Sequence, residues 1–316
     1  MIYTVTLNPT LDHNVFVSDL KAGKINKMNK EAITVGGRGI NVSIVLSELD
    51  VKSKVLGFVA GFTGYEIERQ VQDRGIETDF VWLESGLSRV NIKVKNFMKS
   101  TIRETEIDSE GPEIPDEAIK QLFVKLNAVE DGDVLVLAGG VPHSMQKDIY
   151  EQIMEYVSAK KIKVVVDTTG DIISSTLKYK PYLIKPNMDE LGEIFGENPT
   201  SKVEAIAYAK QLQEMGAQNV LISMGKEGAI LIDDSGKTRF CDALKGKVRN
   251  SVGAGDAMLA GFLSAMMDKD VDVDYALMLG TAAGGATAFS DGLAKRSEIL
   301  DQMKILLKEH ANKPQK

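Results

Sequence analysis

Residues 253–256, which read GAGD, put three small residues and then one carboxylate at the start of a helical pattern. The first N–H groups of a helix lack partners and carry the positive end of its dipole, and glycines let an anion approach them closely. A carboxylate beside a bound phosphoryl group suits a base that removes a proton from an attacking hydroxyl. The same pattern also suits a glycine turn followed by an acid that stabilises the helix dipole. The apolar run that identifies the helix is Met258, Leu259, Phe262 and Leu263.

A second glycine cluster, VGGRGINVS at residues 35–43, also opens a helical pattern. Its glycines do not have the G-x-G-x-x-G spacing of dinucleotide sites and do not directly follow the first strand, which argues against a dinucleotide-dependent oxidoreductase. No G-x-x-x-x-G-K-[ST] nucleotide loop occurs in the chain. Arg38 and Asn41 fall in the first helical turn, where they either face a bound ligand or belong to an exposed glycine-rich turn.

Short apolar runs alternate with helical patterns, which predicts a mostly parallel sheet covered by helices on both faces. Ligands bind beyond the carboxyl ends of such strands, so we expect the ends LAGG (137–140), VDTTG (166–170), IKPN (184–187) and ISMG (222–225) to share one crevice. The chain from Gly253 onward is expected to be nearly all helical. The expected strands are 2–7, 54–60, 133–139, 162–168, 181–187 and 219–225, and the expected helices are 41–49, 116–129, 144–159, 187–196 and 202–215.

Two segments, residues 13–20 and 88–108, alternate polar and apolar residues without a helix between their parts. This period of two predicts antiparallel strands outside the main sheet, in a small β-layer that acts as a lid over the crevice. The lid strands are expected within about 13–35 and 88–108, and the last five residues are expected to fray. The expected apolar face of the lid is Val15, Val17, Val90, Ile92 and Val94.

Composition restricts the class of protein. The 316 residues carry a formal net charge of −7 without a basic run, so we expect no nucleic-acid partner. Cys241 is the only cysteine, which excludes an internal disulfide and fits a cytoplasmic protein. No apolar stretch has the length of a membrane span and the start lacks a signal-peptide pattern, so no membrane partner is expected. The three histidines lie far apart, which gives no His/Cys metal cluster.

Six motifs occur in order along most of the chain: LNPTLD (7–12), GGRGIN (36–41), SR (88–89), KPNMDEL (185–191), SMGKEG (223–228) and NSVGAGD (250–256). In this combination the chain resembles the ribokinase-like (PfkB) carbohydrate kinases, in the phosphosugar branch that includes 1-phosphofructokinases and tagatose-6-phosphate kinases. The resemblance implies an α/β, ribokinase-like three-layer sandwich with a mostly parallel central sheet and a small β-sheet lid, as a single domain over residues 1–316. It also implies ATP and Mg²⁺ as cofactors and a possible homodimer through the lid.

The resemblance assigns a role to each matching residue. Asp256 is the base, and the amides of Gly253, Ala254 and Gly255 hold the transferring phosphoryl group. Asn187 and Glu190 organise Mg²⁺, although an Asn N-cap with acids in the first helical turn explains the same letters. The nucleotide is assigned to Lys185, Asn187, Ser223, Gly225, Gly228, Ser251, Gly253 and Gly255.

The sugar side of the implied site has Asp12, Gly37 and Asn41 around the sugar, and Arg38 and Arg89 on its phosphate. The implied reaction is phosphorylation of fructose 1-phosphate to fructose 1,6-bisphosphate, with tagatose 6-phosphate or fructose 6-phosphate as alternative acceptors. Arg38 stands where the branch usually has lysine, and the loop at 137–142 lacks the serines that the branch often shows. Both departures concern the identity of the sugar phosphate. A non-catalytic sugar-phosphate sensor is disfavoured, since a sensor does not need Asp256.

Overall fold

The computed structural model describes residues 1–98, 101–268 and 270–311, and its main feature is one large twisted sheet. Within these residues ten strands form the main sheet, in the order β14-β13-β12-β11-β10-β9-β1-β4-β5, and β6 pairs with β4. The pairs from β12 to β5 and β6 are parallel, and only β12–β13 and β13–β14 are antiparallel. The strands are β1 (Ile2–Thr6), β4 (Ser53–Ala60), β5 (Glu77–Thr78), β6 (Val81–Leu83), β9 (Val134–Ala138), β10 (Lys163–Asp167), β11 (Leu183–Ile184), β12 (Asn219–Ser223), β13 (Ala229–Ile232) and β14 (Thr238–Cys241).

Helices cover both faces of this sheet, because alternate residues of each central strand are apolar on both sides. In β9, Leu135 and Leu137 join one core and Val134 and Val136 join the other. The first core contains α3 (Asp116–Lys125), α4 (Ile149–Tyr156), α5 (Gly170–Thr176), α6 (Met188–Phe195) and α7 (Lys202–Glu214). The opposite face carries α1 (Arg38–Glu48), α2 (Gly61–Gln72), α8 (Ala254–Met266), α9 (Val273–Phe289) and α10 (Arg296–Ala311).

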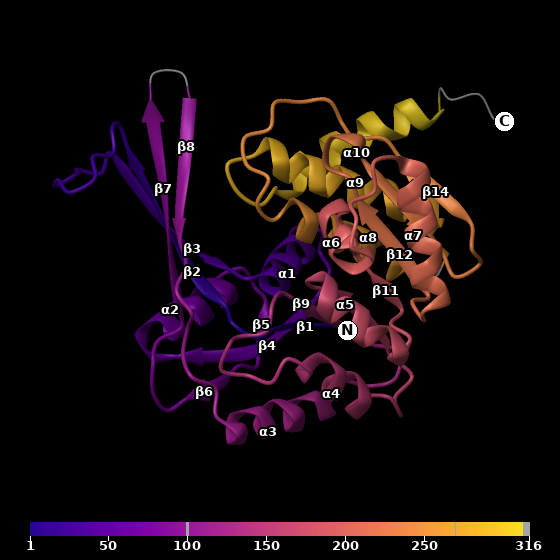
Figure 1. Cartoon of the computed structure of the whole chain (residues 1–316), viewed down its shortest axis with the longest axis horizontal. Coiled ribbons are helices and arrows are strands. Elements are labelled where there is room, and N and C mark those ends of the chain that lie inside the picture. The colour runs from indigo at the N-terminus through magenta and orange to yellow at the C-terminus, as the bar shows by residue number, and fades with distance from the viewer. Residues whose placement is uncertain (99–100, 269, 312–316) are drawn as a thin grey trace.

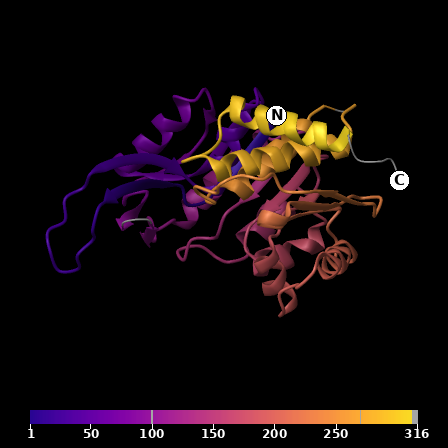
Figure 2. The ribbon, with the colours of Figure 1, turned by 90° about the horizontal axis from the view of Figure 1, so that it is seen from above.

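A small sheet stands beside this body, with its β7–β8 hairpin projecting away from the helices (Figure 1). Its order is β3 (Lys30–Gly36), β2 (Thr10–Val17), β7 (Arg89–Met98) and β8 (Thr101–Ile107). The view from above shows the indigo strands and their long loop extending past the edge of the main body (Figure 2). The prediction of a separate β-layer is therefore confirmed.

The prediction that these strands are purely antiparallel is wrong, because β2 and β7 pair in parallel. Strands β1 and β6 lie parallel to β4 on either side of it, and the chain continues from β1 into β2 and from β6 into β7. Both lid strands thus leave the same carboxyl edge of the main sheet in the same direction. Only the β2–β3 and β7–β8 pairs are antiparallel.

Most of the expected elements are present, with differences at their ends. The expected helix 144–159 is shorter, since α4 spans Ile149–Tyr156, and the expected strand 181–187 contracts to Leu183–Ile184. Pro181 and Pro186 flank that strand and cannot donate to a ladder, which explains its length. The sequence patterns did not predict α2, α5 or the β13–β14 hairpin. From Gly253 the described chain is helical as expected, and residues 312–316 lie outside the described residues.

Helix α9 holds α8 at close range, which fixes the position of the start of α8. A Cβ on Gly280 would lie 2.8 Å from Met258 O, and a Cβ on Gly284 would lie 3.0 Å from Ala254 O. Glycine at these positions therefore allows the two helix backbones to approach each other. Among the described residues, no helix combines the length and the apolar character that a membrane span requires.

Candidate active site

A cavity of about 870 Å³ lies at the carboxyl edge of the main sheet and is lined by residues of both sheets. The ends of β1, β9 and β12 contribute to it, as does the segment after β11, so the predicted crevice is confirmed for LAGG, IKPN and ISMG. The fourth end, VDTTG, contributes Asp167, which contacts the cavity residue Lys185. The predicted site residues that line the cavity are Asp12, Gly37, Arg38, Asn41, Arg89, Lys185, Asn187, Glu190, Ser223, Ser251, Gly253, Gly255 and Asp256.

The start of α8 requires glycine at its cap. Gly253 has φ 80°, in the left-handed region, and a Cβ there would lie 2.7 Å from Leu293 Cδ2. The N–H of Ala254 already donates to Ser251 O at 3.2 Å, and Ala254 does not line the cavity as the structure describes it. Gly255 leaves room for a cation, since a Cβ there would lie 3.2 Å from Lys185 Nζ. The helix start therefore presents backbone and one ammonium group to the cavity.

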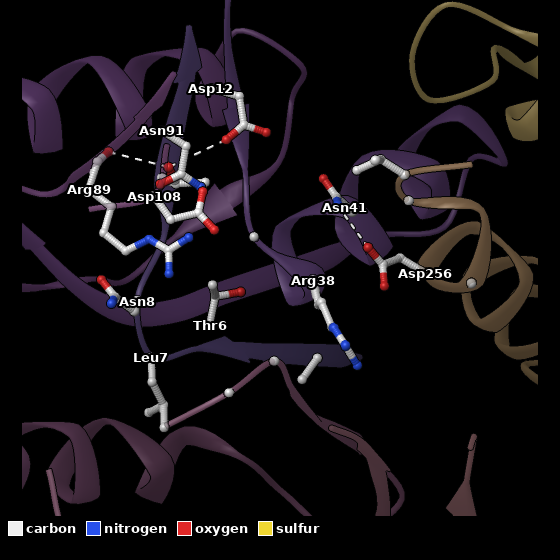
Figure 3. Close-up of a pocket in the computed structure, with 18 of the residues that line it drawn as sticks. Thr6, Leu7, Asn8, Asp12, Arg38, Asn41, Arg89, Asn91, Asp108 and Asp256 are labelled. Atoms are coloured by element: carbon white, nitrogen blue, oxygen red, sulfur yellow. Dashed lines mark hydrogen bonds between the residues drawn. The ribbon is translucent and has the colours of Figure 1, made fainter. Parts of the chain in front are cut away.

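Asp256 lies in the first turn of α8 and is 7% exposed. Asn41 Nδ2 donates a 2.8 Å hydrogen bond to its Oδ2 (Figure 3). Burial raises the pKa of Asp256 to about 6 and the nearby Asp167 carboxylate adds to this, while Asn41, Lys185 and Arg38 oppose it. Such a carboxylate remains mostly ionised at neutral pH, yet is a stronger base than an exposed aspartate.

Two cations contact Asp167, which is fully buried at the end of β10. Lys185 Nζ lies 3.2 Å and Arg38 Nη1 3.6 Å from Asp167 Oδ1, and Arg38 Nη1 also lies 3.3 Å from Glu190 Oε1. This cluster fixes the two cations beside Asp256. Sequence reasoning did not select Asp167, although its place at the end of an apolar strand was a usable signal.

Asn187 and Glu190 form a capping box at the start of α6. Glu190 N donates to Asn187 Oδ1 at 2.8 Å, and Asn187 N donates to Glu190 Oε2 at 2.9 Å. The N-cap explanation of this motif is therefore confirmed as local structure. It leaves Glu190 Oε1 on the side of Arg38, and burial raises the pKa of the Glu190 carboxyl.

The donor set tests whether Mg²⁺ would fit here. Among the described residues, no group of three or more His, Cys, Asp or Glu side chains could hold a metal ion. Mg²⁺ commonly binds through one or two carboxylates, several waters and substrate phosphates. The Glu190 carboxylate at the cavity wall suits that mode, whereas the capping bond already uses the Asn187 side-chain oxygen.

Arg38 and Arg89 enter the cavity from different sides (Figure 3). The Arg89 side chain extends from β7 into the cavity, near the labelled Asn8 and Asp108. The Arg38 guanidinium points away from Arg89. Among the described residues, the buried Arg89 Nε has no hydrogen-bond partner. The predicted pair is thus divided: Arg38 lies beside Glu190 and Asp167, and Arg89 lies in the lid half of the cavity.

The residues predicted for the sugar lie where the two sheets meet. Asp12 is on β2, and its Oδ2 lies 3.0 Å from Lys93 Nζ on β7. Gly37 has φ 122°, and a Cβ there would lie 2.7 Å from Thr6 Cγ2, so this glycine lets the chain turn into α1. Lys93 was missed, although the expected apolar face of Val90, Ile92 and Val94 places it on the opposite, cavity-facing side.

The residues predicted for the nucleotide divide into two groups. Ser223 and Ser251 line the cavity beside Gly253 and Gly255. Gly225 and Gly228 are not among the described residues that line it. Gly228 has a packing reason, because its φ is 92° and a Cβ there would lie 2.0 Å from Cys241 O. A side chain at that position would break the β13–β14 hairpin.

The loop after β9, which lacks the serines that the branch often shows, is held by buried groups. The Tyr150 hydroxyl lies 3.0 Å from Gly139 O, and Thr168 Oγ1 donates to the same oxygen at 2.8 Å. A Cβ added to Gly140 would meet nothing within 4 Å. The loop therefore presents a fixed backbone to the cavity and leaves open space at Gly140.

A buried carboxylate beside helix amides and two cations, at the carboxyl edge of a mostly parallel sheet with a small second sheet, is an arrangement found on the ribokinase fold. The Escherichia coli phosphofructokinase-2 structure in complex with substrates and products shares this fold, with a TM-score of 0.89 over 97% of this chain and 99% of that one, at 23% identity. The pfkB family carbohydrate kinase profile matches residues 6–299. The chain belongs to the pfkB family.

Curated relatives extend over nearly the whole chain. A Bacillus subtilis 1-phosphofructokinase is 41% identical over 308 residues, which are 96% of this chain and 99% of the relative. A Bacillus licheniformis D-tagatose-1-phosphate kinase is 39% identical over 300 residues, which are 95% of this chain and 96% of the relative. The two relatives are named for different phosphosugars, so similarity at this level does not select the sugar.

Proposed function

We propose that this chain transfers the γ-phosphoryl group of ATP to the 6-hydroxyl of fructose 1-phosphate and so forms fructose 1,6-bisphosphate. The observation that carries this proposal is the buried Asp256, bonded to Asn41 and placed in the first turn of α8 beside Gly253 and Gly255. The family and the 41% identity to a 1-phosphofructokinase support the choice of reaction.

In this reaction the hydroxyl oxygen of the sugar attacks the γ-phosphorus, and its proton passes to the Asp256 carboxylate. The bond between the γ-phosphorus and the oxygen that bridges it to the β-phosphate breaks, and ADP leaves. Lys185 and the amides at the start of α8 stabilise the charge on the transferring group. The position of Arg38 beside Glu190 and Asp167 places it at this end of the cavity as well.

The remaining assignments follow the two halves of the cavity. Glu190 would hold Mg²⁺ directly or through water, with Asn187 orienting Glu190, and the ion supplies charge neutralisation on the ATP phosphates. Ser223 and Ser251 face the nucleotide, and Gly225 and Gly228 shape the neighbouring loop. On the lid side Arg89 takes the phosphate of the acceptor, because its buried Nε otherwise lacks a partner in the described chain. The sugar itself is assigned to Asp12, Gly37 and Asn41.

D-Tagatose 1-phosphate is a second candidate acceptor. It differs from fructose 1-phosphate only in the configuration at C4, and the 39% identical relative is named a D-tagatose-1-phosphate kinase. Tagatose 6-phosphate and fructose 6-phosphate are weaker candidates, because they carry the phosphate at the carbon whose hydroxyl fructose 1-phosphate would offer. A sensor without catalysis is the remaining alternative.

A substrate panel tests the proposal. Purified protein is given Mg·ATP with fructose 1-phosphate, tagatose 1-phosphate, the two 6-phosphates or fructose, and ADP release is measured. We expect the highest kcat/KM with fructose 1-phosphate, and Asp256→Asn should lower kcat by about 10²–10⁴ with ATP affinity unchanged. A higher kcat/KM for another acceptor would identify that acceptor as the substrate in place of fructose 1-phosphate. If no acceptor were phosphorylated, the non-catalytic sensor would be the alternative left.

The assembly and location of the enzyme are further parts of the proposal. The outer face of the small sheet carries a row of three exposed isoleucines, Ile33, Ile92 and Ile107, which suits contact with the same face of a second copy. We place the protein in the cytoplasm, where ATP and sugar phosphates are available. The single cysteine is consistent with that reducing compartment.

A further inference from the structure

Lys93 is a buried lysine of the small sheet to which the proposed reaction gives no role. It lines the cavity from β7, and its side chain is 9% exposed. Its Nζ lies 3.0 Å from Asp12 Oδ2 and 3.1 Å from Glu106 Oε1. One ammonium group thus joins carboxylates from the two strands that flank β7.

The strand register explains this contact. Lys93 lies directly opposite Glu106 of β8, while Asp12 of β2 lies opposite Asn91, two residues earlier on β7. Direct and diagonal cross-strand neighbours on one face are within reach of a lysine side chain. Burial lowers the pKa of the ammonium, but the two carboxylates outweigh burial, and the net pKa is raised. Lys93 therefore stays charged between two carboxylates.

The charge balance separates two roles for this lysine. Lys93 with Asp12 and Glu106 carries a net charge of −1, so the group as a whole repels a phosphate dianion. Arg89 differs, because its buried Nε lacks a hydrogen-bond partner in the described chain and its side chain extends into the cavity (Figure 3). The geometry thus places the acceptor's phosphate on Arg89 and gives Lys93 a different task.

We propose that Lys93 is a positioning residue for the acceptor: it orients the Asp12 carboxylate toward the sugar hydroxyls and neutralises the acidic lid wall against which the phosphosugar binds. This inference rests on the proposed function, since it specifies how that acceptor is held. Without Lys93, two unpaired carboxylates would face an anionic substrate. The loss should therefore appear in acceptor binding and not in the chemical step.

Lys95 supplies a matched control on the same strand. It lies two residues further on the same face, and its Nζ is 3.9 Å from Glu104 and 5.9 Å from the Phe16 ring centroid. It is absent from the described residues that line the cavity. Lys95→Met removes the same charge from the same face, away from Asp12.

The test compares Lys93→Met, Lys95→Met, Glu106→Gln and the double variant Lys93→Met/Glu106→Gln. We expect Lys93→Met to raise the KM for fructose 1-phosphate about ten-fold or more, equivalent to about 1.4 kcal/mol, with kcat and the KM for ATP within about three-fold. Lys95→Met should change these constants less than about three-fold, whereas Glu106→Gln should lower the KM for fructose 1-phosphate, because it removes one carboxylate that repels the phosphate. The double variant should recover part of the lost acceptor affinity, because it removes one repelling carboxylate.

Thermal unfolding of each variant shows whether it folds, and Lys93→Gln replaces Lys93→Met if the latter does not. Equal KM values for the Lys93 and Lys95 variants would overturn the inference, as would a fall in kcat with KM unchanged. If the KM of the double variant for fructose 1-phosphate were no lower than that of Lys93→Met, Lys93 would not act by neutralising the acidic wall. The substrate panel on the wild type distinguishes failure of this inference from failure of the proposed function. If the wild type turns over a sugar phosphate and the Lys93 and Lys95 variants do not differ, only the role of Lys93 is rejected. If the wild type turns over no sugar phosphate, the proposed function and the role of Lys93 are both rejected.

Discussion

Asn41 Nδ2 donates a 2.8 Å hydrogen bond to Asp256 Oδ2, and this bond joins the start of α1 to the start of α8. The two glycine-rich segments of the sequence thus meet at one carboxylate. A donor to the ionised form favours that form, so this bond holds the pKa of Asp256 below the value that burial alone would give. In the proposed reaction, Asn41 would therefore help to set the pH range in which Asp256 can act as the base.

The pH profile of kcat/KM should report this relationship. Since the base must be ionised, activity should fall as the pH drops through about 6, the pKa of Asp256. Asn41→Leu removes the donor, and the acidic limb should move to higher pH by about one unit, the equivalent of ~1.4 kcal/mol. Ser43→Ala is the matched control on α1, because Ser43 contacts Thr4 instead of Asp256. A limb that stays in place in Asn41→Leu would show that Asn41 does not tune the base.

Stability should depend on the same carboxyl group. Its pKa is raised in the folded protein from 3.8 to about 6, so the folded state binds more protons than the unfolded state between these values. Stability therefore decreases as the pH rises through this window, and the loss persists above it. Asp256→Asn should raise the free energy of unfolding at pH 8 by up to about 3 kcal/mol, with a smaller gain below pH about 4.

Urea unfolding at pH 8 and pH 4 measures this difference. Asp189→Asn is the comparison, because Asp189 also lies in the first turn of a helix but is exposed. Removing that charge should cost a few tenths of a kcal/mol, since it weakens the interaction with the helix dipole. If Asp256→Asn is less stable than the wild type at pH 8, the carboxylate is not destabilised by burial.

The two arginines should divide binding from chemistry. Arg89→Ala should raise the KM for the sugar phosphate about ten-fold or more, at least about 1.4 kcal/mol, because the phosphate loses its charge-assisted donor. Arg38→Met should instead lower kcat by about 10²-fold with less change in that KM, because Arg38 lies with Glu190 and Asp167. Steady-state kinetics with each substrate varied in turn separates these effects, and the KM for ATP is the internal control for Arg89→Ala. If Arg38→Met instead raised the KM for the sugar phosphate and left kcat unchanged, Arg38 would be assigned to the acceptor's phosphate.

The sequence predicted those parts of the site that depend on local pattern. Short stretches of sequence were enough to locate three features. These are the glycine-rich start of α8 with Asp256, the start of α6 at Asn187, and the strand ends that share the cavity. The parallel sheet followed from apolar runs between helices. The role of the residues at the cavity remains a prediction from the family, as does the description of residues 1–316 as one domain.

The parts that could not be predicted depend on contacts between distant segments. Asp167 at the end of β10 meets Lys185, which follows the neighbouring strand β11, and Arg38, which begins the distant helix α1. Gly228 resembles a ligand-binding glycine in the sequence, but the structure requires glycine there because an added Cβ would meet Cys241 O of a neighbouring strand. Such information lies in strand order, which a single sequence does not state.

The outer face of the small sheet predicts the assembly. Ile33, His13, Ile92 and Ile107 lie opposite one another across β3, β2, β7 and β8, and the three isoleucines are 49%, 38% and 58% exposed. Exposed apolar rows of this kind favour contact with another chain. Val17 does not belong to the accessible part of the face, since it is 3% exposed. We therefore expect the double variant Ile92→Asp/Ile107→Asp to sediment as a monomer at concentrations at which the wild type is a dimer.

Sedimentation velocity over a range of protein concentrations gives the oligomeric state of both proteins. Val203→Asp is the control, because Val203 is 76% exposed on α7, away from the small sheet, and this variant should sediment like the wild type. Because the sheet also forms a wall of the cavity, loss of the partner should loosen it. The double variant should then show a higher KM for the sugar phosphate and more ATP hydrolysis without sugar. A wild type that stays monomeric at every concentration would exclude the dimer, and an unchanged sugar-independent ATPase in a monomeric double variant would show that pairing does not support the lid.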